Sequence, residues 1–171
     1  MLSLAATAPA KLMASDDQNL YHYDGAAIWY VSLELFGAPA LLTNVSLPVL
    51  DLAVDTKLDG WVYWSQQDDA DTGSVMRIPK PPQLGTSPAP FIGKIPQPHA
   101  LLADDTGAYW VSYGVGGCDV KASQIMRLRE AQTGALPEQI ATSISCPVIA
   151  QDARNVYWAA GGNVFAKGKG P

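Results

Sequence analysis

Leu52-Ala53-Val54-Asp55, followed shortly by Trp61-Val62-Tyr63-Trp64, is the stretch that decides the fold, because the chain repeats its pattern. Three further copies carry an apolar run, an aspartate and then an aromatic run, so that the four copies are centred on Tyr21, Tyr63, Tyr109 and Tyr157. Successive tyrosines are 42, 46 and 48 residues apart. Internal repeats of about 20 to 50 residues are typical of solenoids and propellers. We therefore predict a repeat protein with four units.

Each unit has the pattern of a small antiparallel sheet. Short apolar and aromatic runs are typical of strands, and each aromatic run is followed by a second apolar run such as Val75-Met76-Arg77-Ile78. Four short strands in about 45 residues are typical of a propeller blade. We predict one all-β domain over residues 1–171, with blades at 9–46, 47–97, 98–146, and 147–171 together with 1–8. The repeated Tyr-Trp pairs are expected to fill the gaps between blades.

The two ends of the chain are complementary in this pattern. The last unit stops after its third strand, Asn163–Lys167, whereas Leu2–Thr7 is similar to the fourth strands of the other units. We therefore predict that the N-terminal strand completes the C-terminal blade and closes a ring of four four-stranded blades, which would remove two exposed sheet edges. The alternative is a half-ring that pairs with a second copy into eight blades. The protein is thus expected to be a monomer or a homodimer.

The repeat resembles the YWTD and NHL-like class of β-propeller repeats. The resemblance rests on Val62-Tyr63-Trp64-Ser65, Ala108-Tyr109-Trp110-Val111 and Val156-Tyr157-Trp158-Ala159, each of which is followed by a further strand. The sequence departs from the receptor pattern at Ser65, Val111 and Ala159, where that repeat usually has threonine. The resemblance implies a scaffold that binds a ligand or a protein, and it identifies no ligand.

Composition limits the partners. The chain has 16 acidic and 11 basic residues and a net charge of −5, which argues against a nucleic-acid partner. No apolar run reaches the roughly 18 residues of a membrane-spanning helix. The N-terminal residues have no basic region of the kind that begins a signal peptide.

Two groups of polar residues are candidate binding sites. Asp69-x-Asp71-x-Gly73 resembles part of a calcium loop but lacks the downstream glutamate, so a solvated hairpin is expected in preference to a Ca²⁺ site. His99 stands where the sister units have Val49 and Val148, near the mouth of the expected channel. Asp51 is the one carboxylate inside the predicted inner strands. His99 and Asp51 are therefore the ligand-binding candidates, and Ca²⁺ or an ion on the axis is the only cofactor suggested.

Cys118 and Cys146 are predicted to form a disulfide. Both lie in connecting segments that emerge on the same face of a four-stranded meander, and neither lies inside an apolar strand. Disulfides persist in oxidising compartments. An exported or periplasmic origin is therefore suspected, even though the chain begins without a signal peptide.

A binding role is expected in preference to catalysis. Gly-x-Ser-x-Gly is absent, and the two histidines, His22 and His99, lie in different repeats. Four aspartates recur at the ends of the first strands and are expected to cap turns: Asp16, Asp55, Asp105 and Asp152. We predict a non-catalytic propeller scaffold. The alternative is a propeller-type hydrolase or lyase with a metal at the channel mouth.

Overall fold

The computed structural model describes residues 10–35, 37–80, 86–114, 117–118, 122–130 and 136–170. Within these ranges the chain forms fifteen strands and no helix, and therefore no helix long and apolar enough to cross a membrane. The strands form four antiparallel sheets, three with four strands and one with three. The all-β prediction is confirmed at this level.

The sheets follow one another along the chain, and each is a meander of consecutive strands. Sheet 1 consists of β1 (Leu12–Ser15), β2 (Asn19–Tyr23), β3 (Ala27–Ser32) and β4 (Ala40–Asn44). Sheet 2 consists of β5 (Val49–Val54), β6 (Trp61–Gln67), β7 (Thr72–Pro79) and β8 (Ala89–Pro96). Sheet 3 consists of β9 (Pro98–Asp104), β10 (Gly107–Ser112), β11 (Ser123–Arg129) and β12 (Glu138–Ser143). Sheet 4 consists of β13 (Val148–Gln151), β14 (Asn155–Ala160) and β15 (Asn163–Gly168).

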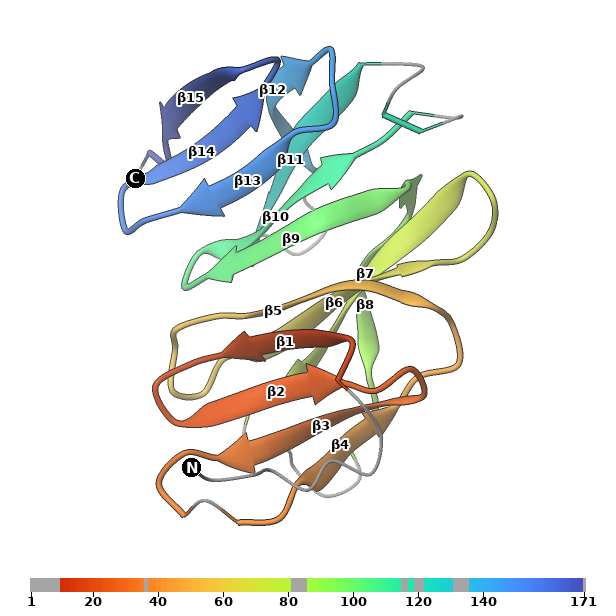
Figure 1. The fold of residues 1–171 in the computed structure, drawn as a ribbon, viewed down its shortest axis with the longest axis vertical. Coiled ribbons are helices and arrows are strands. Elements are labelled where there is room, and N and C mark those ends of the chain that lie inside the picture. The colour runs from red at the N-terminus through yellow and green to blue at the C-terminus, as the bar shows by residue number, and fades with distance from the viewer. Residues whose placement is uncertain are drawn as a thin grey trace.

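The four sheets are arranged in an open row (Figure 1). The first strands are neighbours in order, with β5 next to β1 and β9, and β13 next to β9. Sheets 1 and 4 lie at opposite ends of the longest axis (Figure 1), so the described residues form no closed ring. The predicted closing strand, Leu2–Thr7, lies outside the described residues.

The Tyr-Trp pairs give sheets 2, 3 and 4 two different faces, and in sheet 1 His22 holds the tryptophan position. Side chains alternate between the faces of a strand, so Tyr63 and Trp64 point to opposite sides of sheet 2. Trp64 packs with Tyr21 of sheet 1, whereas Tyr63 packs in a second cluster with Trp110 of sheet 3. We call the two sides of each sheet its tyrosine face and its tryptophan face. At these two interfaces, the tyrosine face of one sheet covers the tryptophan face of the next.

Burial confirms that these aromatic pairs fill the gaps between sheets. Tyr63, Tyr109 and Trp110 are 0% exposed, and Tyr21 and Trp64 are 1% exposed. Sheet 4 differs, because Tyr157 and Trp158 are only partly buried there.

Candidate functional site

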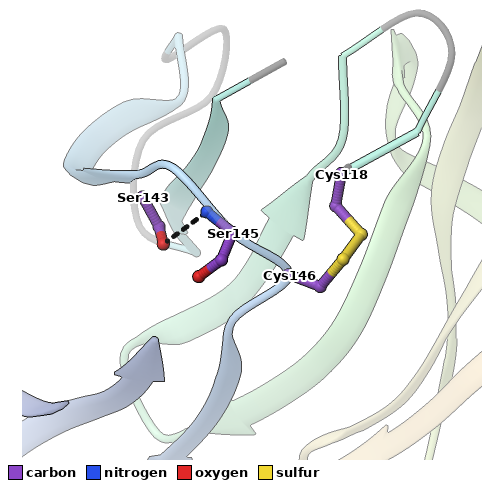
Figure 2. The surroundings of a disulfide bond; sticks show 4 residues. All are labelled: Cys118, Ser143, Ser145 and Cys146. Carbon is purple, nitrogen blue, oxygen red and sulfur yellow. Dashed lines mark hydrogen bonds between the residues drawn. A yellow bond between two sulfur atoms is a disulfide. The ribbon is translucent and has the colours of Figure 1, made fainter. Parts of the chain in front are cut away.

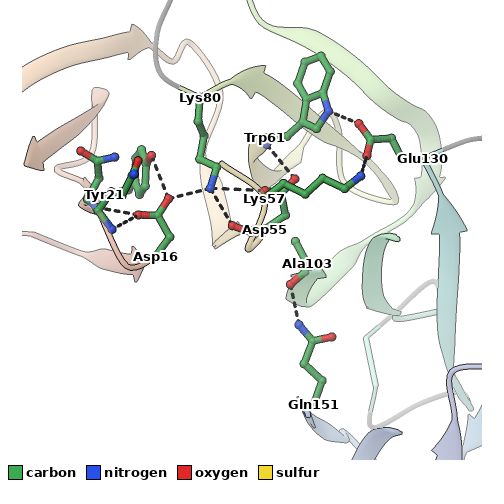
Figure 3. Close-up of polar contacts among 11 residues, drawn as sticks. Asp16, Tyr21, Asp55, Lys57, Trp61, Lys80, Ala103, Glu130 and Gln151 are labelled. Atoms are coloured by element: carbon green, nitrogen blue, oxygen red, sulfur yellow. Dashed lines mark hydrogen bonds and ion pairs between the residues drawn. The ribbon is translucent and has the colours of Figure 1, made fainter. Parts of the chain in front are cut away.

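A buried lysine joins sheets 1 and 2 at the end where the first strands stop. Lys80 follows β7, and its Nζ lies 2.7 Å from Oδ2 of Asp16 and 3.4 Å from Oδ1 of Asp55 (Figure 3). It also donates a 2.8 Å hydrogen bond to the backbone oxygen of Asp55. The side chain of Lys80 is 3% exposed and that of Asp55 is 0% exposed. One buried cation therefore pairs with carboxyl groups of two different sheets.

The two carboxyl groups beside Lys80 respond differently to burial. Burial acts to raise the pKa of Asp16, but the bond from Lys80 and the backbone N–H groups of Gln18 and Asn19 outweigh it, so this pKa lies below its ordinary value. Burial dominates at Asp55, whose pKa is raised although Lys80 and the Trp61 N–H oppose the shift. Lys80 is therefore the cation that both carboxyl groups share.

Glu130 makes the corresponding connection between sheets 2 and 3. It follows β11 and accepts hydrogen bonds from Lys57 Nζ, at 2.9 Å, and from Trp61 Nε1 (Figure 3). Arg77 lies over the Trp61 ring, 4.0 Å from its centroid, with NH1 3.7 Å from Glu130 Oε1. These side chains come from both sheets, so the cluster holds the interface together.

Lys169 repeats the arrangement between sheets 3 and 4. It follows β15, and its Nζ lies 2.6 Å from Oδ2 of Asp104. Arg127 donates to the backbone oxygen of Lys169, and Gln151 donates a 2.6 Å bond to that of Ala103 (Figure 3). The residue after the third strand therefore bridges each of these three interfaces.

Sequence reasoning missed these three bridging residues. The available signal was that Lys80, Glu130 and Lys169 are all charged and all occupy one position of the repeat. The capping aspartate of the third repeat also needs correction, because Asp104, not Asp105, accepts the Thr106 N–H at 2.8 Å. Elsewhere the expected caps are present: Asp16 accepts the N–H groups of Gln18 and Asn19, Asp55 that of Trp61, and Asp152 those of Arg154 and Asn155.

An open hollow of about 390 Å³ lies at this end, between sheets 1 and 2. Its charged lining residues are Asp16, Asp17, Lys57 and Lys80. Asp16 and Lys80 bind each other, and Lys57 binds Glu130. Most of the charge around the hollow is therefore already engaged in holding sheets together.

His99 and Asp51 lie near the start of β9 and of β5, away from the end that carries the ion pairs. Asp51 accepts the backbone N–H of Leu101 at 2.7 Å, so it links the first strands of sheets 2 and 3. A bulge in β9 presents that N–H: Ala100, with φ of 49°, and Leu101 together lie opposite Trp110. The His99 ring stacks on Tyr113, with 4.4 Å between centroids and 20° between planes.

His99 and Asp51 are close enough to influence each other's protonation. Burial raises the pKa of Asp51, and the nearby His99 opposes this shift. Burial lowers the pKa of His99, and Asp51 opposes that shift in turn. Because β5 and β9 are neighbours and Asp51 bonds the Leu101 N–H, the structure brings together the two residues that the sequence put forward as ligand-binding candidates.

Asp69 and Asp71 lie in the hairpin between β6 and β7. Asp69 Oδ1 accepts the N–H groups of Asp71 and Thr72 at 2.9 and 2.7 Å, and Oδ2 accepts the Thr72 hydroxyl at 2.8 Å. These bonds lower the pKa of Asp69. Gln97 donates a 2.6 Å bond to the backbone oxygen of Ala70 and so tethers the hairpin to the link before β9. Across the described ranges, no three His, Cys, Asp or Glu side chains gather as a set of metal ligands.

The predicted disulfide between Cys118 and Cys146 is confirmed. Cys118 lies between β10 and β11, and Cys146 lies just before β13 (Figure 2). Their Cα atoms are 5.0 Å apart, and the bond closes a loop with a sequence separation of 28 residues. It therefore links the connection between β10 and β11 of sheet 3 to the residues that lead into β13 of sheet 4.

Reduction of this disulfide is expected to lower the free energy of unfolding by about 3 kcal/mol, because the unfolded chain loses its loop constraint. Urea unfolding with and without a phosphine reductant measures the change. The double variant Cys118→Ser/Cys146→Ser should match the reduced protein and should no longer respond to reductant. Equal unfolding midpoints for the oxidised and reduced protein would contradict the prediction.

Two polar regions therefore stand out: the inter-sheet ion pairs at one end, and His99, Asp51 and Tyr113 toward the other. The residues of the first region are largely bound to one another. Comparison with known proteins adds no assignment to either region. The sequence matches no protein-family model and no curated protein.

Proposed function

We propose that the protein is a binding scaffold of the β-propeller type, in which the four sheets are successive blades. Three features support this arrangement: the fourfold repeat, the neighbouring first strands and the packing of tyrosine faces on tryptophan faces. The recurring charged residues join sheets and cap turns, which is a structural use of the groups that catalysis would need.

The binding surface lies at the end that carries His99, the hairpin at 66–73 and Cys118. The observation that carries this proposal is the half-buried stack of His99 on Tyr113, with the Asp51 carboxyl group nearby. Such a group offers a flat ring for apolar contact and polar atoms for orientation.

The same end is held in place before any ligand arrives. The disulfide fixes the position of Cys118, and Gln97 anchors the hairpin through Ala70. A hairpin that is already tethered loses less conformational entropy when a ligand binds. The ligand expected here presents a flat apolar face together with hydrogen-bonding groups.

A nuclear magnetic resonance titration of the whole ¹⁵N-labelled protein tests this surface. The probes are a panel of mono- and disaccharides and short aromatic peptides, added one at a time. At least one probe should shift the amide resonances around His99, Leu101 and Tyr113, and Tyr113→Ala should abolish the effect.

The matched control is Lys57→Met, which changes an exposed side chain at the other end and should leave the shifts unaltered. Shifts confined to the hollow beside Lys80, or no shifts with any probe, would count against the proposed surface.

A further inference from the structure

The tyrosine face of sheet 4 is apolar and uncovered. Tyr21, Tyr63 and Tyr109, which hold the equivalent position in the other three sheets, are at most 1% exposed, but no sheet covers Tyr157 in the described structure. Val164 is 75% exposed and Val148 is 68% exposed, and the two lie on either side of Ala159, which pairs with both. The strand register places eight residues on this face, and none is charged: Val148, Ala150, Asn155, Tyr157, Ala159, Val164, Ala166 and Gly168.

The tryptophan face of sheet 1 is the matching surface at the other end of the row. Met13 lies opposite His22, His22 opposite Trp29, and Trp29 opposite Leu41. Met13 and Leu41, on its two edge strands, are 66% and 46% exposed, whereas His22, Ala27 and Val31 on its central strands are at most 7% exposed. The register places no Asp, Glu, Lys or Arg among the strand residues of this face, which are Met13, Ser15, Leu20, His22, Ala27, Trp29, Val31, Leu41 and Asn44. The carboxylate of Asp24, in the turn before β3, accepts the Trp29 indole N–H at 2.8 Å.

Outer faces whose strands carry no charged side chain are unusual for the ends of a repeat array. Terminal repeats normally present a polar outer face to water, and contiguous exposed apolar residues mark interaction surfaces. The two end faces are also of opposite kinds, one tyrosine and one tryptophan. These are the two kinds of face that pack together between sheets 1 and 2 and between sheets 2 and 3.

We infer that the tyrosine face of sheet 4 binds the tryptophan face of sheet 1 of a second copy. Within one chain these faces lie at opposite ends of the longest axis (Figure 1), so they cannot meet. Two copies related by a twofold axis form this contact twice and close a ring of eight sheets. Closure satisfies both ends of each chain, as head-to-tail contacts do when their rotation completes a circle.

The dimer deepens the proposed propeller scaffold, because it rests on the blade arrangement proposed above. It does not use the surface around His99 and Tyr113. A failure of dimerisation would therefore leave the ligand titration to be judged separately, and a failed titration would leave the dimer intact.

Light scattering coupled to gel filtration of the whole chain tests the inference. The expected mass is twice the 18.2 kDa of one chain, at all micromolar concentrations. Val164→Asp and Met13→Asp each place a charge on one end face at an exposed position, so each variant should fold and yet have the mass of one chain. Leu58→Asp is the matched control, because Leu58 is 65% exposed in a turn away from both faces, and this variant should remain a dimer.

The two variants also distinguish the head-to-tail contact from a symmetric contact of like faces. Mixing Val164→Asp with Met13→Asp should restore some dimer, because one of the two interfaces in the mixed ring is unaltered. A wild-type mass of one chain would overturn the inference. So would an open-ended polymer, or a dimer that only one of the two variants disrupts.

Discussion

Lys80→Met is expected to lower the free energy of unfolding by about 3–5 kcal/mol, which is the usual cost of removing one partner from a buried ion pair. The methionine fills the same space but leaves the buried Asp55 and the partly buried Asp16 without their cation. Because Lys80 also bonds the backbone oxygen of Asp55, that acceptor loses its partner as well. Urea unfolding at pH 7, followed by tryptophan fluorescence, measures the change.

Lys57→Met is the matched control for this substitution. Lys57 also pairs with one carboxylate across a sheet interface, but its side chain is 44% exposed. Exposed ion pairs contribute only about 0–1 kcal/mol. The same chemical change should therefore have a much smaller effect at Lys57, and equal losses at both positions would contradict the role assigned to burial.

The loss caused by Lys80→Met should shrink in acid. The pKa of Asp16 is lowered in the folded protein, so its ionised form contributes stability above the unfolded-state pKa of about 3.9. That contribution disappears as the pH falls through the folded-state pKa. The difference between wild type and variant is therefore largest near neutrality and declines below about pH 4. A difference that stays constant from pH 7 to pH 3 would show that lost packing, and not charge, explains the destabilisation.

The sequence predicts the sheets well because their signals are local. The alternation of apolar residues and the Tyr-Trp pairs act within one repeat, and each repeat forms its own meander. The disulfide follows for a similar reason, since both Cys118 and Cys146 lie in loops at the same end of sheet 3.

The arrangement of the sheets relative to one another is harder to derive. Whether four sheets close a ring depends on the small rotation at each interface, and no residue pattern within one repeat specifies that rotation. Lys80 and Asp16 are 64 residues apart, so their pairing becomes evident only once the sheets are packed. The displacement of the turn cap from Asp105 to Asp104 has a local cause, because Asp105 and Thr106 alone form the turn between β9 and β10.

The candidate site shows the same division. His99 and Asp51 could be nominated from their departure from an apolar consensus. Tyr113 could not, because it lies outside the repeated pattern and meets His99 only through the pairing of β9 with β10. The bulge that directs the Leu101 N–H toward Asp51 likewise has no signal in the repeat.

Trp110→Ala is expected to cost about 3–5 kcal/mol, the range for removing a large buried aromatic side chain. Trp110 is 0% exposed and lies in the cluster between sheets 2 and 3, where Tyr63 and Leu101 are among its buried members. Its indole N–H also donates to the Ser112 hydroxyl at 3.2 Å. Alanine would leave a cavity in the middle of the row of sheets, and the midpoint of thermal unfolding by circular dichroism should fall accordingly.

Trp158→Ala provides the comparison, because Trp158 occupies the same position of the repeat in sheet 4. It is only partly buried, and its ring stacks on Phe165, which is itself exposed. Folding buries less apolar area of Trp158 than of Trp110, so the expected loss of stability is about 1 kcal/mol. A large loss at Trp110 with a small one at Trp158 would show that the tryptophan of the repeat stabilises the protein in proportion to how completely the neighbouring sheet buries it. Equal losses at the two positions would instead mean that sheet 4 is packed as tightly as sheet 3 in solution.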